Sequence, residues 1–301
     1  MSFLAAASRL PRPSPPLFAR ALSISTHYSQ GTGRILPLII AGLQSSGVSV
    51  PSPDTALTAV QLRGVDQFHI GGVNSALALF DKMGIKKGDV VVDIGSGLGG
   101  PARLVSERFG CSVVGVDLCE EFVAVAKEIN VWTRSSGVEF RVGDGSSLEG
   151  MEPGTVDSMF MLHVGMNVED KVALGGAVGR GLKEGGVFGV FDMVAGDGRA
   201  LDYPVPFATE AGQAFLSREE EYVEAFEGAG LSLVGMEDKT EYCLDVIKGN
   251  AKRAKEKGRE GGLGPTIVQG KNVGTKMKNI VAMFKDGRMR ASEMIFEKKS
   301  S

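Results

Sequence analysis

Residues 90–100 read Val-Val-Val-Asp-Ile-Gly-Ser-Gly-Leu-Gly-Gly, and this stretch decides the fold of the chain. Its first half is apolar and β-branched, which indicates a short strand that is buried on both faces of a parallel sheet. The glycines that follow predict a turn that opens the next helix. At such a turn the backbone can approach a ligand closely, because no side chain blocks it.

Strand and helix patterns alternate regularly from residue 70 onward. Repeated strand–helix units predict an α/β fold, in which helices cover both faces of a parallel sheet. Ligands of such sheets bind beyond the carboxyl ends of the strands, where the glycine turn lies. The expected strands are Asp89–Ile94, Ser112–Asp117, Val138–Val142, Val156–Leu162, Val187–Val194, Leu231–Met236 and Arg288–Glu297. The expected helices are Gly72–Met83, Gly100–Phe109, Glu120–Arg134, Val168–Leu182, Arg218–Ala229 and Asn272–Phe284.

One interpretation of the glycine turn is a dinucleotide site. Gly95, Gly97 and Gly100 have the spacing of the dinucleotide fingerprint. Asp117 follows about 20 residues later, where the fingerprint expects an acidic residue that binds the ribose. A pyrophosphate, however, prefers the positive end of a helix with no carboxylate nearby. Asp93, at the tip of the preceding strand, therefore disfavours a nicotinamide cofactor.

Three acidic residues favour a cationic ligand instead. Asp93 and Asp117 lie at the carboxyl ends of the first two predicted strands, and Asp144 follows the third. Together with the glycines of residues 95–99, these acids resemble the motifs of class I S-adenosylmethionine (SAM) methyltransferases. In that class they face the methionyl end, the ribose and the adenine of SAM.

Four further segments narrow the resemblance. They are His27-Tyr28-Ser29, residues 66–72 (Asp-Gln-Phe-His-Ile-Gly-Gly), residues 161–167 (Met-Leu-His-Val-Gly-Met-Asn) and residues 203–207 (Tyr-Pro-Val-Pro-Phe). In this order they resemble the sarcosine/dimethylglycine N-methyltransferases of glycine betaine synthesis, a branch of the type 11 methyltransferases. The similarity extends over nearly everything from residue 27 onward.

The resemblance implies a Rossmann-like fold with a mostly parallel seven-stranded sheet, whose last strand is antiparallel. It implies a methyltransferase domain over residues 67–301, preceded by a helical cap over residues 27–66. Within the domain, residues 195–213 are expected to form a lid-like loop. Residues 242–286 are expected to form a helical insertion before the last strand.

The resemblance also implies SAM as the cofactor and a small molecule as the substrate. Tyr28 and His163 are expected to be catalytic, because phosphoethanolamine methyltransferases are similar in pairing an N-terminal tyrosine with a histidine after the fourth strand. His69, Asn167 and Tyr203 are expected at the substrate. The cysteines and histidines do not cluster, so no metal site is expected. The residues expected at the cofactor are Asp93, Gly95, Ser96, Gly97, Gly99, Asp117, Leu118, Asp144, Gly145, His163 and Tyr28.

The chemistry sets what such a site must supply. Methyl transfer from a sulfonium is an in-line displacement, so the protein contributes mainly positioning and electrostatics. A protonated amine acceptor must lose a proton, which a histidine such as His163 can accept. The expected reaction is N-methylation of sarcosine or dimethylglycine, a small carboxylate that becomes an onium zwitterion.

Other functions stay open from the sequence. One alternative is S-methylation of 4-methylthio-2-hydroxybutyrate in dimethylsulfoniopropionate synthesis; a thioether has no proton to lose, so His163 would then only shape the pocket. A quinone-ring C-methyltransferase is another. A non-catalytic SAM-binding protein is disfavoured because Asp93, Asp117 and Asp144 are all intact.

Composition excludes some partners. A formal net charge of −3 provides no basic field for nucleic acid. The apolar run Ile35–Leu43 is only nine residues long and contains a proline, so stable membrane insertion is not expected. Residues 1–26 contain arginine and serine but no acidic residue, which is typical of an organelle transit peptide. The expected location is the mitochondrion, with a plastid as the alternative.

Overall fold

The sheet at the centre of the molecule has the strand order β3-β2-β1-β4-β5-β7-β6. The computed structural model describes residues 33–49, 56–256 and 263–300. Strands β1 to β5 pair in parallel, whereas β7 runs antiparallel to both β5 and β6. The predicted seven-stranded, mostly parallel sheet with an antiparallel last strand is confirmed. The strands are β1 (Val90–Ile94), β2 (Ser112–Asp117), β3 (Val138–Val142), β4 (Val156–Leu162), β5 (Leu182–Ala195), β6 (Leu231–Asp238) and β7 (Met289–Lys298).

Strand β5 differs most from its prediction. It begins at Leu182, whereas the sequence predicts a strand only from Val187. Leu182 already pairs with β4, ahead of a register shift in that ladder. Gly185 has a φ of 70°, which glycine adopts without steric cost, so the strand continues through this irregularity.

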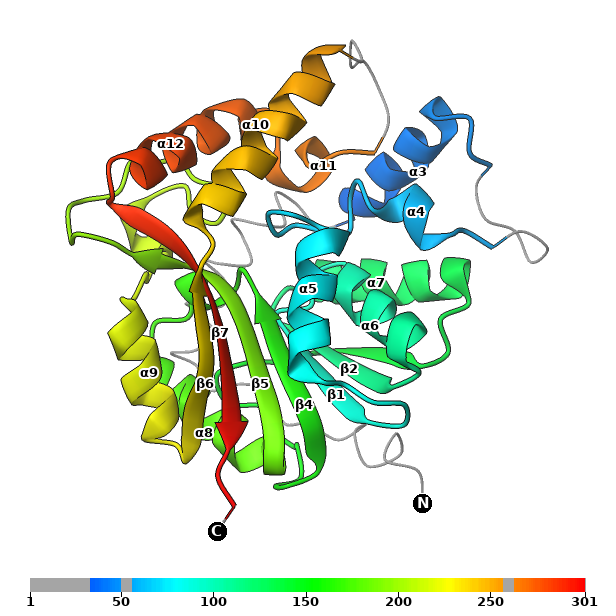
Figure 1. Ribbon diagram of the computed structural model, residues 1–301. Helices are drawn as coiled ribbons and strands as arrows, with labels where there is room; N and C mark the ends of the chain where they lie inside the picture. The colour runs from blue at the N-terminus through cyan, green and yellow to red at the C-terminus, as the bar shows by residue number, and fades with distance from the viewer. Residues whose placement is uncertain (1–32, 50–55, 257–262, 301) are drawn as a thin grey trace.

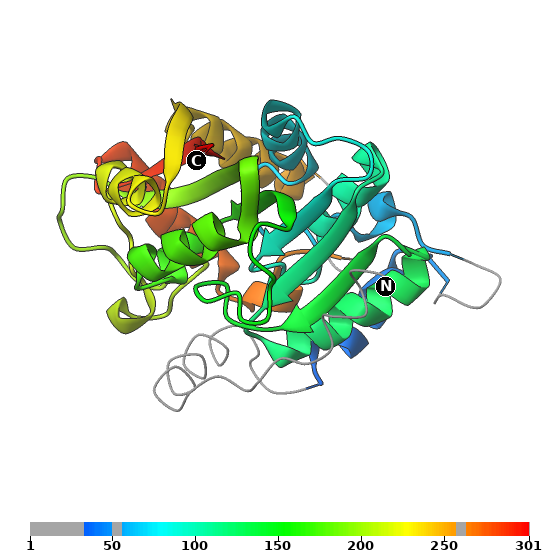
Figure 2. The same cartoon turned by 90° about the horizontal axis from the view of Figure 1, so that it is seen from below.

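Helices cover both faces of the sheet, because successive strand residues are buried on opposite sides. In β1, Val91 packs in the apolar cluster that includes α5, α6 and α12, whereas Val92 packs in the cluster that includes α8 and α9. Figure 2 shows α5 and α8 on opposite sides of the sheet. The helices beside the sheet are α5 (Val73–Met83), α6 (Gly100–Phe109), α7 (Glu120–Thr133), α8 (Lys171–Gly181), α9 (Glu219–Glu227) and α12 (Val273–Lys285).

A group of helices lies above the carboxyl ends of the parallel strands (Figure 1). The group consists of α12 together with α3 (Ile35–Ser45), α4 (Ala59–Leu62), α10 (Thr240–Glu256) and α11 (Thr266–Gln269). One carboxylate oxygen of Glu121 in α7 accepts the backbone N–H groups of Arg34 and Ile35, at 2.8 and 3.0 Å, and so joins the start of α3 to α7. None of the described helices has the length and apolarity that a bilayer crossing requires.

Candidate functional site

The glycine turn between β1 and α6 is tightly enclosed by other segments. Gly95 has a φ of 71°, and a Cβ there would lie 2.4 Å from the side chain of Val164. Gly99 has a φ of 78°, and a Cβ there would lie 2.0 Å from the ring of Phe140. Both positions therefore require glycine for conformation and for space. The turn is the close-approach element that the sequence predicts.

Asp93 is the last but one residue of β1, directly before this turn. Its side chain is 2% exposed, and its Oδ2 atom has no hydrogen-bond partner among the described residues. Burial raises the pKa of Asp93 well above its usual value, and nearby Asp117 adds to this, whereas Arg103 opposes it. Because buried polar atoms are normally hydrogen-bonded, the unpartnered oxygen points to a ligand donor such as an ammonium group.

Asp117 and Asp144 follow at the ends of the neighbouring strands. The two oxygens of Asp117 accept the backbone N–H groups of Gly97 and Cys119, each at 2.8 Å. Asp144 uses one oxygen, Oδ1, to accept the backbone N–H and the hydroxyl of Ser146, at 2.8 and 2.7 Å. A carboxylate offers about four acceptor sites, so both groups retain capacity for a ribose or an adenine amine.

The remaining predicted cofactor residues lie around these acids. Ser96 is 4% exposed and its hydroxyl has no described partner. Gly145 lies against β1, since a Cβ there would come within 2.5 Å of the Ile94 side chain. Leu118 is half-buried directly after Asp117. The residues present therefore fit SAM: two unpartnered polar atoms, three carboxylates and a glycine turn lie together at the ends of adjacent strands.

Residues 66–70, here called the strap, lie across the glycine turn. A Cβ on Gly100 would lie 2.1 Å from the carbonyl oxygen of Asp66, and one on Gly97 would lie 3.2 Å from the ring of Phe68. Arg103 holds the strap in place, because its Nη2 donates to Asp66 at 3.1 Å and to the Leu98 carbonyl of the turn at 2.6 Å. No sequence motif marks this buried ion pair.

His163 directly follows β4, where the strap meets the end of that strand. Its backbone N–H donates to the carbonyl of Phe191 at 2.7 Å, and its φ is 56°. Its Nδ1 accepts the backbone N–H of Ile70 at 3.4 Å, whereas its Nε2 is shielded from solvent and has no described partner. The ring of His69 lies edge-on to it, with 6.1 Å between ring centroids.

Both imidazoles are held in the neutral form. Burial lowers the pKa of His69 to about 4, against a weaker opposing effect of its hydrogen bond to the Gly72 carbonyl. Burial, reinforced by the neighbouring His69, holds the pKa of His163 well below its usual value. The structure thus brings His69 and His163 together beside the glycine turn, as neutral rings.

Asn167 and Tyr203 lie on the loop side of the site. The Asn167 amide donates to the carbonyls of Phe207 and Gln213, both at 2.8 Å, so its N–H groups hold the loop between β5 and α9. Tyr203 is partly buried against the apolar cluster that includes α12. Contact of either with a substrate stays a prediction. Tyr28 and residues 1–26 lie outside the described residues.

A buried network that sequence reasoning missed supports the turn after His163. Asp192, fully buried within β5, accepts the hydroxyl of Tyr222 at 2.7 Å. A Cβ on Gly165 would lie 2.4 Å from the Asp192 carboxylate. Burial raises the pKa of Asp192 to about 6, opposed by the hydrogen bond from Tyr222 and by nearby Lys171. An acid inside an otherwise apolar strand pattern was the available signal.

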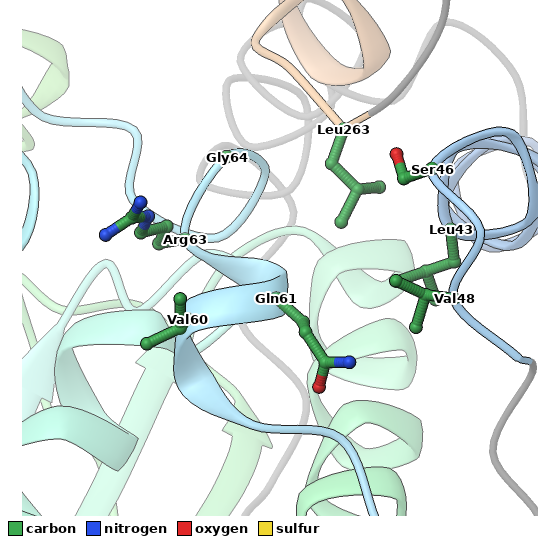
Figure 3. Close-up of a pocket in the computed structure, with 8 residues that line it drawn as sticks. All are labelled: Leu43, Ser46, Val48, Val60, Gln61, Arg63, Gly64 and Leu263. Carbon is green, nitrogen blue, oxygen red and sulfur yellow. The ribbon is translucent and has the colours of Figure 1, made fainter.

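A separate pocket lies between α3, α4 and Leu263 (Figure 3). It is lined by Leu43, Ser46, Val48, Val60, Gln61, Arg63, Gly64 and Leu263. None of the residues predicted for the cofactor or the substrate lines it, so it is not the candidate site. No cluster of three or more metal-ligating side chains occurs in the described part of the chain.

Comparison with known proteins agrees with this geometry. Residues 92–190 match the methyltransferase domain family Methyltransf_11. Phosphoethanolamine N-methyltransferase 1 of Triticum aestivum is 30% identical over 178 residues, which cover 59% of this chain and 35% of that protein. The chain therefore matches about a third of the length of this relative.

Two solved structures share the fold. Haemonchus contortus phosphoethanolamine N-methyltransferase 2, bound to phosphomonomethylethanolamine and S-adenosylhomocysteine, superposes with a TM-score of 0.66 at 23% identity, over 77% of this chain and 54% of that one. A sarcosine dimethylglycine methyltransferase-like protein from Galdieria sulphuraria superposes with a TM-score of 0.61 at 16% identity, over 75% of this chain and 85% of that one.

Residues 92–190 therefore match a methyltransferase domain, and they lie within the Rossmann-like fold of class I SAM-dependent methyltransferases. SAM is the cofactor of this class. The predicted fold is confirmed, and the predicted cofactor, SAM, is the one that this class of domain uses.

Proposed function

We propose that the chain transfers a methyl group from SAM to a small carboxylate substrate and converts it to an onium zwitterion. The most specific form of this proposal is N-methylation of sarcosine or dimethylglycine toward glycine betaine. The observation that carries it is the shielded, unpartnered Nε2 of His163, which lies at the end of β4 beside the glycine turn. The name of the Galdieria sulphuraria structure supports the substrate class.

Different described residues are proposed to bind the different parts of SAM. Asp93 and Ser96 would receive the methionyl end, Asp117 the ribose, and Asp144, Leu118 and Gly145 the adenine. When bound, SAM supplies a methyl group on a positively charged sulfur. The chain contributes a fixed geometry for in-line displacement, which is the main source of rate in such a reaction.

The substrate is proposed to lie between the two histidines and the loop that Asn167 holds. His163 would contact it directly, with His69 and Tyr203 lining the same space. Tyr28 is proposed as a second catalytic residue. Both imidazoles are neutral, so neither places a positive charge next to the cationic sulfur of SAM. A positive charge there would repel the sulfur and weaken SAM binding.

A second candidate is S-methylation of a thioether acid such as 4-methylthio-2-hydroxybutyrate. The observation that favours it is the low basicity of both imidazoles, since burial lowers the pKa of His69 to about 4 and that of His163 well below its usual value. A thioether acceptor has no proton to lose and needs no base. Both substrates are small carboxylates, and similar pockets suit both.

A product screen tests the proposal. The full chain would be incubated with SAM and, separately, with sarcosine, dimethylglycine, 4-methylthio-2-hydroxybutyrate and a quinone precursor, and methylated products identified by mass spectrometry. We expect methyl transfer to sarcosine, dimethylglycine or 4-methylthio-2-hydroxybutyrate. Asp117→Asn is the matched control, in which this transfer is expected to be lost. Transfer to the quinone alone, or to none, would overturn the substrate class.

The N-terminal segment carries a further proposal about location. Residues 1–26 are proposed to direct the protein to the mitochondrion, with a plastid as the alternative. Their acid-free, arginine-containing composition supports this. A fluorescent fusion of the full chain, compared with one lacking residues 1–26, tests it; identical distribution of the two would contradict it.

A further inference from the structure

We infer that the strap makes His163 a hydrogen-bond donor: the Ile70 N–H occupies Nδ1, so the ring carries its proton on Nε2 and presents it to an acceptor oxygen of the substrate. The inference rests on the proposed function in placing the substrate at His163. It opposes the role of proton acceptor that the sequence suggests for this residue.

The hydrogen bond from the strap fixes the tautomer. A backbone N–H can only donate, so the Nδ1 atom 3.4 Å from the Ile70 nitrogen must present a lone pair. A neutral imidazole has one protonated and one unprotonated nitrogen, and the hydrogen bond at one decides which. Nε2 therefore carries the proton.

The strap is itself fixed at its other end. Asp66 and Arg103, 4% and 5% exposed, form an ion pair with 3.1 Å between Oδ2 and Nη2. Phe68, midway along the strap, lies against Gly97 of the glycine turn. The Ile70 N–H is thus held in place by contacts to the turn that binds the cofactor.

The Nε2–H group lacks an acceptor among the described residues. It is shielded from solvent, and a buried donor without an acceptor is costly. The neighbouring His69 differs, because its Nε2 lies 2.9 Å from the Gly72 carbonyl and is satisfied there. Of the two rings, only that of His163 has its protonated nitrogen available, and a substrate carboxylate oxygen is the strongest available acceptor for it.

The transfer of the methyl group does not require His163 to accept a proton. The lone pair of the acceptor atom forms the new bond to the methyl carbon as the carbon–sulfur bond breaks, and that electron pair stays on sulfur. A tertiary amine such as dimethylglycine, bound as the free base, has no proton to lose. With sarcosine, the product ammonium loses its proton to water after transfer.

Two substitutions of His163 separate a donor from a base. His163→Gln keeps an N–H donor near the position of Nε2 and removes the basic nitrogen, whereas His163→Leu removes both. We expect His163→Gln to retain kcat within about tenfold of wild type, and His163→Leu to lose roughly 10–100-fold or more, the value of a hydrogen bond to a charged group. Equal loss in both variants, with SAM affinity by calorimetry unchanged, would overturn the inference.

A spectroscopic measurement reads the tautomer without any turnover. The full chain, labelled with ¹⁵N-histidine, would be examined by two-dimensional NMR at pH 7, free and with S-adenosylhomocysteine. His163→Gln assigns the signals of His163, and His69 serves as an internal reference for the Nε2–H form. An unprotonated Nδ1 in His163 supports the inference; a protonated Nδ1 or a cationic ring overturns it. This result stands even if the product screen finds no methyl acceptor, which would remove only the proposed function.

Discussion

The cofactor side and the substrate side of the site are built in different ways. The cofactor side comes from one continuous part of the chain, residues 93–145, in which each strand end adds an acid or a glycine. The substrate side is assembled from pairs of distant residues, such as Ile70 with His163 and Asn167 with Phe207. The proposed SAM site therefore depends mainly on local motifs, whereas the proposed substrate side depends on long-range contacts.

The largest expected effect on stability concerns the ion pair of Asp66 and Arg103, which connects the strap to the glycine turn. Arg103→Met leaves the buried carboxylate of Asp66 without its cation, which is expected to cost about 3–5 kcal/mol in the free energy of unfolding. Urea denaturation measures it. The SAM affinity is expected to fall too, because Arg103 also holds the Leu98 carbonyl of the turn.

Two controls sharpen that result. Arg199→Met breaks an exposed ion pair with Asp197 and is expected to leave the urea midpoint unchanged. Replacing both buried partners, Asp66→Leu with Arg103→Met, is expected to recover part of the lost stability, since no charge is then stranded. Equal effects of Arg103→Met and Arg199→Met would show that the strap is not held by its buried pair.

The two sides also differ in how much of their structure could be predicted from the sequence. The strand segments and the acids at Asp93, Asp117 and Asp144 follow from short apolar runs and the residues at their ends, so they could be predicted. The contact of Ile70 with His163 spans 93 positions and uses a backbone N–H, which has no side-chain signature. The early start of β5 could not be predicted, because Leu182 pairs with Val156 of β4 across a register shift and such a long-range contact has no local pattern.

The next largest effect concerns the substrate side and its pH dependence. Burial raises the pKa of Asp192 from 3.8 to about 6, a shift worth about 3 kcal/mol. A raised folded-state pKa stabilises the fold fully below pH 4, and this contribution disappears as the pH rises through 6. The free energy of unfolding of wild type, relative to Asp192→Asn, should therefore fall by about 3 kcal/mol between pH 4 and pH 7. A pH-independent difference between the two proteins would contradict the burial of this carboxylate.

A smaller effect tests the close packing of the cofactor side. Gly99→Ala and Gly185→Ala both place a methyl group at positive φ, but only at Gly99 does the new Cβ meet another group, the ring of Phe140. Gly99→Ala should therefore be less stable than Gly185→Ala by about 1–3 kcal/mol, the typical cost of overpacking. Denaturation midpoints measure the difference, and calorimetry should show weaker SAM binding in Gly99→Ala alone. Indistinguishable variants would mean that the turn is not closely enclosed.

The smallest effect separates the two sides most directly. Asn167→Ala removes the donors to the Phe207 and Gln213 carbonyls, at a cost of about 1–2 kcal/mol that falls on the loop between β5 and α9. We expect faster amide hydrogen exchange in that loop and a higher KM for the methyl acceptor, with unchanged SAM affinity. Asn279→Ala, which removes a single donor to the Pro204 carbonyl in the same loop, is the matched control and should show a weaker form of the same change. Because Asn167 is bonded to the loop and not to the glycine turn, a loss of SAM affinity equal to the rise in KM would show that the two sides are one cooperative unit.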